Sequence, residues 1–537
     1  MSWMLLIVAV VIIACILCNQ FTNRFGIPTL LAFIVLGMLF GSDGLLKIPF
    51  DNYAFAETIC SAALILIMFY GGFGTNWNQA RPTAVPAVLM STLGVVLTAV
   101  LTGVFCYFVL GFPLWEGLLV GSLLGSTDAA SVFSILRSKQ LNLKYNTASL
   151  LEVESGSNDP FAYMMTMITL TVLQSGRATG PELAVMIVRQ LAFGLLFGAV
   201  IGLAASKFIN RFQFHTRGFD SAFVLATAVL SYAAPSVLSG NGYLSAYLAG
   251  LILGNRPLPN KRSMVNFIDG ITGLMQMLIF FLLGLLSFPS ALPAIIPTAL
   301  LIFLFLTFAA RPVATTLLLT PLRKPLNQQL LISWAGLRGA ASIVFAIMVS
   351  TSGTAFQNDL FHIVFTVVLL SISLQGSFLA PVSRKLRMID NDENVMRTFN
   401  DYADESAINF VRMTITADHD WAWKPLSQLS IGPDLLIAMV LRGGNTLVPH
   451  GNTVLQPDDV VILGAASFCD DSHISLWETT IDQKHPWKDR ELRNLTLDRG
   501  QLIVLIRRGP GETIIPNGKT TIREGDVLVI NRDTTLM

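Results

Sequence analysis

Long apolar stretches alternate with short polar connections over about the first 380 residues, whereas the remaining residues mix apolar and polar positions. A helix that spans a membrane needs about 20 mostly apolar residues. Stretches of this kind recur between Gly, Pro and charged residues and predict about 13 transmembrane helices. They lie at residues 3–18, 27–42, 57–74, 84–110, 114–136, 147–173, 182–206, 219–236, 241–255, 265–288, 292–320, 329–350 and 360–382. The first part of the chain is therefore expected to be an all-α polytopic membrane domain.

The pattern changes after the basic residues at 384–387, where short apolar runs are separated by Gly and Pro, as is typical of strands. This region contains a repeat: Arg442-Gly443 recurs as Arg508-Gly509, and Asp458-Asp459-Val460 is answered by Gly525-Asp526-Val527. Each copy is small for an independent domain, so the two copies are expected to stack or to dimerise. We predict a cytoplasmic α+β regulatory region.

The predicted domain organisation has four parts. They are the membrane domain at 1–385, a linker at 386–400, a first regulatory module at 401–470 and a second, divergent module at 471–537.

Charge sharpens this division. Lys, Arg, Asp and Glu make up 30 of the first 382 residues, about 8%, and 39 of the remaining 155, about 25%, which is ordinary for soluble proteins. A wholly soluble enzyme is excluded, and without a basic run no nucleic-acid partner is expected. Loops after odd-numbered spans hold sixteen Lys and Arg residues and loops after even-numbered spans hold two. Because cytoplasmic loops carry the positive excess, this predicts an N-terminus outside and a C-terminal region inside the cell.

Ionisable residues within membrane spans are costly and usually functional. The candidates considered are Asp128, Glu152, Glu154, Asp159, Arg189, Arg311 and Arg338. Four of these seven lie in the fifth and sixth predicted spans, so we expect the functional site there. Arg311 precedes Pro312 and is interpreted as a bend in the eleventh span.

An internal repeat gives the site its expected geometry. Residues 125–132 and 336–343 share the pattern G-x-x-x-A-A-S followed by a β-branched residue. The two copies lie in spans five and twelve, which cross the membrane in opposite directions, as inverted repeats do. Small and polar interruptions at matching points of inverted halves indicate helices that unwind at mid-membrane. We therefore predict two broken helices around one site.

The sixth span supplies the carboxylates. An unpaired buried charge costs several kcal/mol, so Glu154 and Arg338 are predicted to form a structural ion pair. This leaves Asp159 without a fixed partner, free to hold either a proton or a dehydrated cation. Hard oxygen ligands suit such an ion, and we predict a monovalent cation site formed by Asp159, Ser155 and Thr127. No catalytic constellation of an intramembrane enzyme is present, and no cofactor is expected.

These motifs have a familiar form. Gly125-Ser126-Thr127-Asp128, Glu154-Ser155-x-x-Asn158-Asp159 and Gly336-Leu337-Arg338-Gly339 resemble the sodium/proton exchanger family of the NhaP type over residues 1–385. The resemblance implies that Asp159 binds the ion with help from Ser155 and Thr127, that Asp128 and Asn158 organise the crossing of the broken helices, and that Glu154 and Arg338 pair. It also implies electroneutral exchange, because Asn158 precedes Asp159 where other exchangers have two Asp residues. A mobile core, a homodimer and a place in the bacterial inner membrane follow from the same resemblance.

The C-terminal copies resemble the TrkA-C module of potassium-conductance regulators, and the whole arrangement looks like the cell-volume-regulation antiporters. This favours K⁺ over Na⁺ as the ion exchanged for H⁺ and leaves a small regulatory ligand open. Two alternatives stay: a Na⁺ or Li⁺/H⁺ antiporter whose tail is only regulatory, and a channel-like cation pathway gated by the tail. The channel is disfavoured because no T-V-G-Y-G-like filter is present.

Overall fold

The chain folds as two compact units, Met1–Asp404 and Glu405–Met537, in a computed structural model. The residues that the structure describes are 9–18, 29–139, 141–176, 179–212, 214, 216, 218–259, 261–390, 408–417, 419–429, 435–442, 445–447, 449–466, 474–483, 485–495, 501–508, 512–514, 516 and 518–533. Residues 391–400 of the predicted linker lie outside this set, as do residues 3–8 of the first predicted span.

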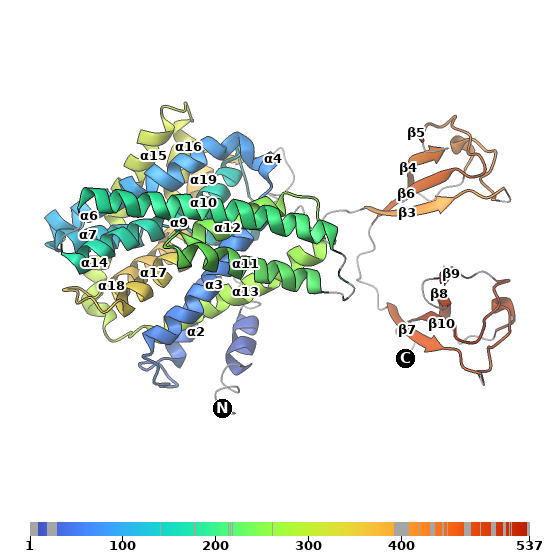
Figure 1. Ribbon diagram of the computed structural model, residues 1–537, viewed down its shortest axis with the longest axis horizontal. Helices are drawn as coiled ribbons and strands as arrows, with labels where there is room; N and C mark the ends of the chain where they lie inside the picture. The colour runs from blue at the N-terminus through green and yellow to red at the C-terminus, as the bar shows by residue number, and fades with distance from the viewer. Residues whose placement is uncertain are drawn as a thin grey trace. The chain divides into compact units, whose positions relative to one another are not determined.

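The first unit is helical (Figure 1). After a short helix at Ala9–Cys18, the α-helices are α2 (Thr29–Phe40), α3 (Tyr53–Gly74), α4 (Trp77–Ala80), α5 (Ala84–Leu89), α6 (Val95–Leu110), α7 (Leu114–Leu123), α8 (Ala129–Ser138), α9 (Thr147–Ser175), α10 (Gly180–Arg211), α11 (Phe219–Val237), α12 (Gly242–Gly254), α13 (Lys261–Leu286), α14 (Leu292–Phe305), α15 (Arg311–Leu319), α16 (Leu326–Trp334), α17 (Ala340–Thr351), α18 (Leu360–Leu370) and α19 (Leu379–Lys385). Three π-helical turns interrupt the series: η2 (Met90–Gly94), η3 (Leu306–Ala310) and η4 (Ser371–Gln375).

Within the described residues, six helical segments are long and apolar enough to cross a membrane, or seven if the bent pair Leu360–Gln375 and Leu379–Lys385 counts as one span. Five shorter apolar helices accompany them. The predicted helical membrane domain is confirmed, and the total of 13 spans stays a prediction.

Small residues bring these helices close together. Gly194, Gly198 and Gly202 recur every fourth position on α10 and are buried. A Cβ atom on Gly198 would lie 2.9 Å from the carbonyl oxygen of Ser245 on α12, which runs beside α10 in Figure 1. Such stripes allow backbones to approach where lipid offers no hydrophobic driving force between helices.

Both predicted helix breaks are present. Five residues, 124–128, separate α7 from α8, and another five, 335–339, separate α16 from α17. The breaks meet, because the backbone N–H of Asp128 donates to the carbonyl of Leu337 at 2.8 Å. A Cβ atom on Gly339 would lie 2.3 Å from the Cβ of Asp128, so this crossing requires glycine. The shared G-x-x-x-A-A-S pattern therefore marks two segments that pack against each other.

A two-residue ladder secures the end of the membrane unit. Strand β1 (Asn142–Leu143), in the α8–α9 connection, pairs antiparallel with β2 (Ile389–Asp390). The end of the described part of the first unit is therefore hydrogen-bonded to the connection that follows α8, the second half of the first broken helix.

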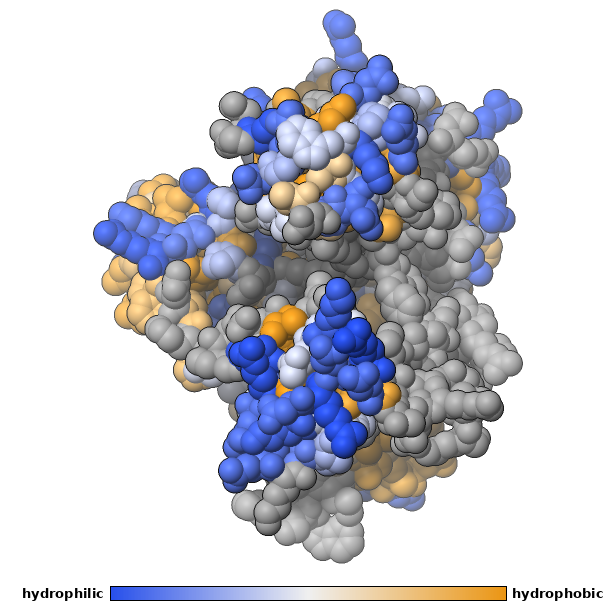
Figure 2. All heavy atoms as spheres, turned by 90° about the vertical axis from the view of Figure 1, so that its right-hand side faces the viewer, coloured by the Kyte–Doolittle hydropathy of each residue, from blue (hydrophilic) through white to orange (hydrophobic). Residues whose placement is uncertain are grey.

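The second unit contains two four-stranded antiparallel sheets of identical topology, with strand orders β3-β6-β4-β5 and β7-β10-β8-β9. The strands are β3 (Ile408–Thr414), β4 (Leu435–Arg442), β5 (Asn445–Leu447), β6 (Val460–Ala466), β7 (Ile474–Thr480), β8 (Gln501–Arg508), β9 (Glu512–Ile514) and β10 (Val527–Asp533). The predicted repeat is confirmed. In the described residues, the helical part of each module is a single 3₁₀ turn, η6 (Leu426–Gln428) in the first and η7 (Leu492–Asn494) in the second. Figure 2 shows mostly hydrophilic side chains on the described surface of the modules.

An ion pair between a partly exposed arginine and a buried aspartate recurs in both modules. Arg442 donates two hydrogen bonds to Asp459 at 2.7 Å, and Arg508 donates two to Asp526 at 2.8 Å. The hydrogen bonds from Arg442 lower the pKa of the Asp459 carboxyl below its ordinary value. The matched residues of the sequence repeat therefore link the end of β4 to the start of β6 in the first sheet and the end of β8 to the start of β10 in the second.

Candidate functional site

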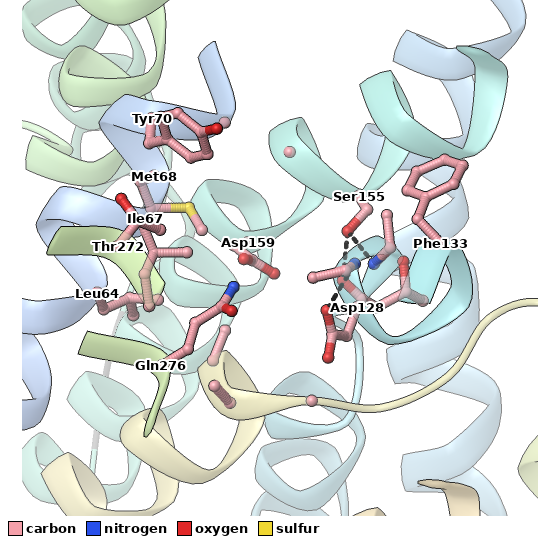
Figure 3. A pocket seen from close by; sticks show the side chains of 18 of the residues that line it. Leu64, Ile67, Met68, Tyr70, Asp128, Phe133, Ser155, Asp159, Thr272 and Gln276 are labelled. Carbon is pink, nitrogen blue, oxygen red and sulfur yellow. Dashed lines mark hydrogen bonds between the residues drawn. The ribbon is translucent and has the colours of Figure 1, made fainter. Parts of the chain in front are cut away.

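A cavity of about 710 Å³ reaches the two helix breaks. Figure 3 shows Asp159 near its centre, with side chains of α3 and α13 on one side and Asp128, Phe133 and Ser155 on the other. Its lining also includes residues of both breaks, Ser126, Thr127 and Gly339. Every residue predicted for the cation site, Asp159, Ser155 and Thr127, lines this cavity.

The cavity occupies one half of the membrane unit. It is lined by the N-terminal half of α9 up to Asp159, by the C-terminal half of α3 and by residues 269–280 of α13. These halves lead to the connections at 139–146, 75–76 and 255–260, which belong to the loops after odd-numbered predicted spans, where the Lys and Arg excess lies. Beyond Asp159, Tyr163 packs against Tyr243 and Phe345, with ring centroids 5.0 and 5.7 Å apart. Aromatic rings from three helices therefore lie one helical turn beyond the carboxylate.

Asp128 caps the helix that follows the first break. Its carboxylate accepts the backbone N–H groups of Ala130 and Ser131, at 2.9 and 3.3 Å, and the Ser131 hydroxyl at 2.5 Å. A carboxylate in this position satisfies free N–H groups and complements the positive end of the helix dipole. Asp128 thus holds the start of α8 at the crossing.

Two polar residues of α9 form hydrogen bonds with the same break. The Ser155 hydroxyl donates to the Thr127 carbonyl and accepts the N–H of Ala129, both at 2.8 Å. The Asn158 amide donates to the Thr127 hydroxyl at 2.5 Å. The two Ser155 bonds replace backbone partners that the unwound segment lacks, and the Asn158 bond fixes the Thr127 side chain.

Asp159 has a partner that the sequence analysis did not single out. Its carboxylate accepts a hydrogen bond from the hydroxyl of Ser126, and only 6% of Asp159 is exposed. Ser126 was visible as part of the Gly-Ser-Thr-Asp motif, but the direction of its side chain could not be predicted.

The predicted ion pair between Glu154 and Arg338 is wrong in its basic partner. Glu154 pairs with Arg311, and both side chains are at most 2% exposed. Arg311 follows the π-helical turn η3, and a Cβ atom on Gly336 would lie 2.8 Å from its Nε, so the guanidinium lies against the second break. Arg338 instead donates from Nη1 to the Ser126 carbonyl at 2.8 Å. The residue interpreted as marking a bend therefore carries the charge that neutralises Glu154.

Another carboxylate was overlooked. Asp269 lies within the span predicted at 265–288 and lines the cavity, where it accepts the Tyr70 hydroxyl at 2.5 Å. Its charge inside an apolar stretch was the signal that could have identified it. Within the described residues, no group of three His, Cys, Asp or Glu side chains is placed to hold a metal ion.

Comparison with known proteins identifies this arrangement. The family described as "Sodium/hydrogen exchanger, transmembrane" matches residues 7–385. The chain belongs to the sodium/hydrogen exchanger family. The TrkA-C domain matches twice in the second unit of this exchanger, at residues 410–466 and 477–532, which confirms the predicted resemblance of both modules.

Curated relatives extend over most of the chain. A protein of Alkalimonas amylolytica named "K(+)/H(+) antiporter NhaP" is 34% identical over 465 residues, which cover 86% of this chain and 80% of the relative. A protein of Shewanella oneidensis named "K(+)/H(+) antiporter NhaP2" is 34% identical over 459 residues, covering 84% and 79%. The solved structure of the sodium proton antiporter MjNhaP1 from Methanocaldococcus jannaschii matches with a TM-score of 0.63 and 22% identity, covering 72% of this chain and 99% of that one. This likeness shows that the membrane unit has the same fold.

Proposed function

We propose that this exchanger is an antiporter that moves one K⁺ against one H⁺ by alternating access around Asp159. The observation that carries the proposal is the position of this carboxylate, which is buried, accepts a hydrogen bond from Ser126 of the first helix break and lines the cavity. A proton and a dehydrated cation would occupy the same carboxylate in turn, with Ser155 and Thr127 as oxygen donors beside it.

The charges around the breaks support electroneutral exchange. Three acidic side chains, Asp128, Glu154 and Asp159, stand against two basic ones, Arg311 and Arg338. Their formal sum is −1 when all are ionised and zero when Asp159 holds a proton or a monovalent cation. A neutral core crosses an apolar barrier at far lower cost than a charged one. Movement of the loaded core is therefore favoured with either ion.

The cavity and the aromatic rings support alternating access over a continuous channel. Solvent would reach Asp159 from the side of the basic loops, which the positive-inside rule assigns to the cytoplasm. Tyr163, Tyr243 and Phe345 pack against one another beyond Asp159, and in this proposal they would close the opposite side. We infer an N-terminus outside the cell, a cytoplasmic second unit, a homodimer in a bacterial inner membrane, and a role in cell-volume and pH homeostasis.

K⁺ is favoured because the 34%-identical relatives carry K(+)/H(+) antiporter names and because the TrkA-C match occurs twice. Na⁺ is the second candidate, since a 25%-identical protein of Methanocaldococcus jannaschii is named "Probable Na(+)/H(+) antiporter 2". The tail would then regulate the exchanger without changing which ion it carries.

The test is transport by the purified full chain in lipid vesicles that contain a pH-sensitive dye. Addition of K⁺, Rb⁺, Na⁺ or Li⁺ should move protons, most effectively with K⁺, and an imposed membrane potential should leave the rate unchanged. If no alkali cation moves protons, antiport is refuted. A rate that depends on voltage refutes one-for-one exchange.

A further inference from the structure

Three hydroxyl groups lie near the first break, on Ser126, Thr127 and Ser155, but they differ in what they contact. The Ser155 hydroxyl bridges the Thr127 carbonyl and the Ala129 N–H, and the Thr127 hydroxyl accepts the Asn158 amide. Both groups therefore hold the unwound backbone against α9. Among the three, the hydroxyl that the structure places on the Asp159 carboxylate belongs to Ser126.

Ser126 is also fixed from behind. Arg338, which comes from the other break, donates Nη1 to the Ser126 carbonyl at 2.8 Å, while its own backbone N–H donates to the Ser371 hydroxyl at 3.0 Å. The carbonyl of Ser126 is thus occupied, and its side chain faces the cavity. Ser126 and Arg338 are both at most 1% exposed, so packing restricts their positions.

We propose that the Ser126 hydroxyl is a direct ligand of the transported monovalent cation, and that Arg338 positions it. In the empty site the hydroxyl donates to the Asp159 carboxylate. When a dehydrated cation binds that carboxylate, rotation of the hydroxyl turns its oxygen toward the ion, because a hydroxyl can either donate or offer lone pairs. The proposal rests on the proposed function and adds a ligand to it.

Selectivity follows from the same geometry. Hard oxygen donors suit alkali cations, whereas sulfur suits softer ions. Cysteine has the same number of side-chain heavy atoms as serine, with a larger sulfur atom on a longer bond, so S126C exchanges oxygen for sulfur at this point without adding an atom. Tl⁺ is a soft monovalent cation of about the size of K⁺, and it should tolerate that exchange better than K⁺ does.

The experiment measures the half-saturating concentrations of K⁺, Rb⁺, Na⁺ and Tl⁺ for the full chain in vesicles. For S126A and S126C we expect the value for K⁺ to rise about tenfold, as for the loss of one polar contact to a charge, with turnover at saturation within about twofold. S126T, which keeps the hydroxyl, should restore the K⁺ value. S126C should bind Tl⁺ with less loss than K⁺.

Ser122 provides the matched control. It lies one helical turn before Ser126 and is fully buried, and its hydroxyl donates to the Leu118 carbonyl at 2.8 Å. S122A should leave every half-saturating concentration unchanged. Because Arg338 positions Ser126, we expect R338K to raise the half-saturating concentration of K⁺ by a larger factor than the factor by which it lowers turnover at saturation.

Two failures can be told apart. A wild-type chain that moves no protons with any cation would refute the proposed function. A wild-type chain that exchanges K⁺ normally, while S126A and S126C match S122A for K⁺ and Tl⁺, would refute only the ligand role of Ser126. If S126A does not fold, S126C and S126T carry the same decision.

Discussion

The ion pair between Glu154 and Arg311 allows the arrangement of the core to be tested by a double-mutant cycle. Both side chains are at most 2% exposed, and Arg311 Nη2 donates to Glu154 Oε1, while Glu154 Oε2 and Arg311 Nε have no hydrogen-bond partner among the described residues. Removing one partner of such a buried pair costs about 3–5 kcal/mol, because the other charge is left unpaired. We therefore expect E154Q and R311M each to lower the free energy of unfolding by roughly that amount.

The double variant E154Q/R311M should be much less unstable than the sum of the two, with an interaction energy of about 2 kcal/mol. R338M removes instead the bond to the Ser126 carbonyl, which costs about 1–3 kcal/mol, and its interaction energy with E154Q should be less than half that of R311M. The assay is denaturation of the purified full chain in detergent, followed by circular dichroism at a helix wavelength. An interaction energy between Glu154 and Arg338 as large as that between Glu154 and Arg311 would refute the pairing.

Further predictions concern the crossing, the tail and the division between the two units. G339A should destabilise the membrane unit by about 1–3 kcal/mol and abolish transport, since its Cβ would lie 2.3 Å from that of Asp128. G270A, whose Cβ meets open space, should change neither stability nor transport. Thermal unfolding of both variants measures the stability, and transport in vesicles measures the activity. D459N should destabilise the first module by about 2 kcal/mol at pH 7. Because the pKa of Asp459 is lowered, this difference should shrink as pH falls below the ordinary Asp range of about 4, and hydrogen exchange of β4 and β6 at pH 7 and pH 3 tests it. Deletion of residues 395–537 should change how transport is regulated and leave the order of cation preference unchanged. An altered order of cation preference in vesicles would show that the deleted residues also determine selectivity, against this prediction.

The two broken helices could be predicted because their signal is local. The two copies of the G-x-x-x-A-A-S pattern lie where the backbones cross, and a Cβ atom on Gly339 of the second copy would meet Asp128 of the first. The membrane unit and the repeated modules were predictable for the same reason, since apolar runs and the recurrence of Arg442 and Asp459 are visible in the sequence. Each of these features can be recognised from residue types along the chain, without knowing which side chains meet in the fold.

The partners of the buried charges could not be predicted in this way. Arg311 and Arg338 both lie inside spans, and sequence distance does not show which of them meets Glu154. That choice depends on the π-helical turn before Arg311 and on its packing against Gly336. The same holds for Ser126, because in an unwound segment a one-residue difference decides whether a hydroxyl faces the cavity or the neighbouring helix.

The central claim is that proton and cation share the carboxylate of Asp159. Its most direct test is K⁺-driven proton movement in vesicles that contain D159N, compared with D220N, which alters a buried carboxylate at the start of α11. We expect D159N to be folded and to move no protons, while D220N exchanges like the wild-type chain. K⁺/H⁺ exchange by D159N at a rate near that of the wild-type chain would contradict the account.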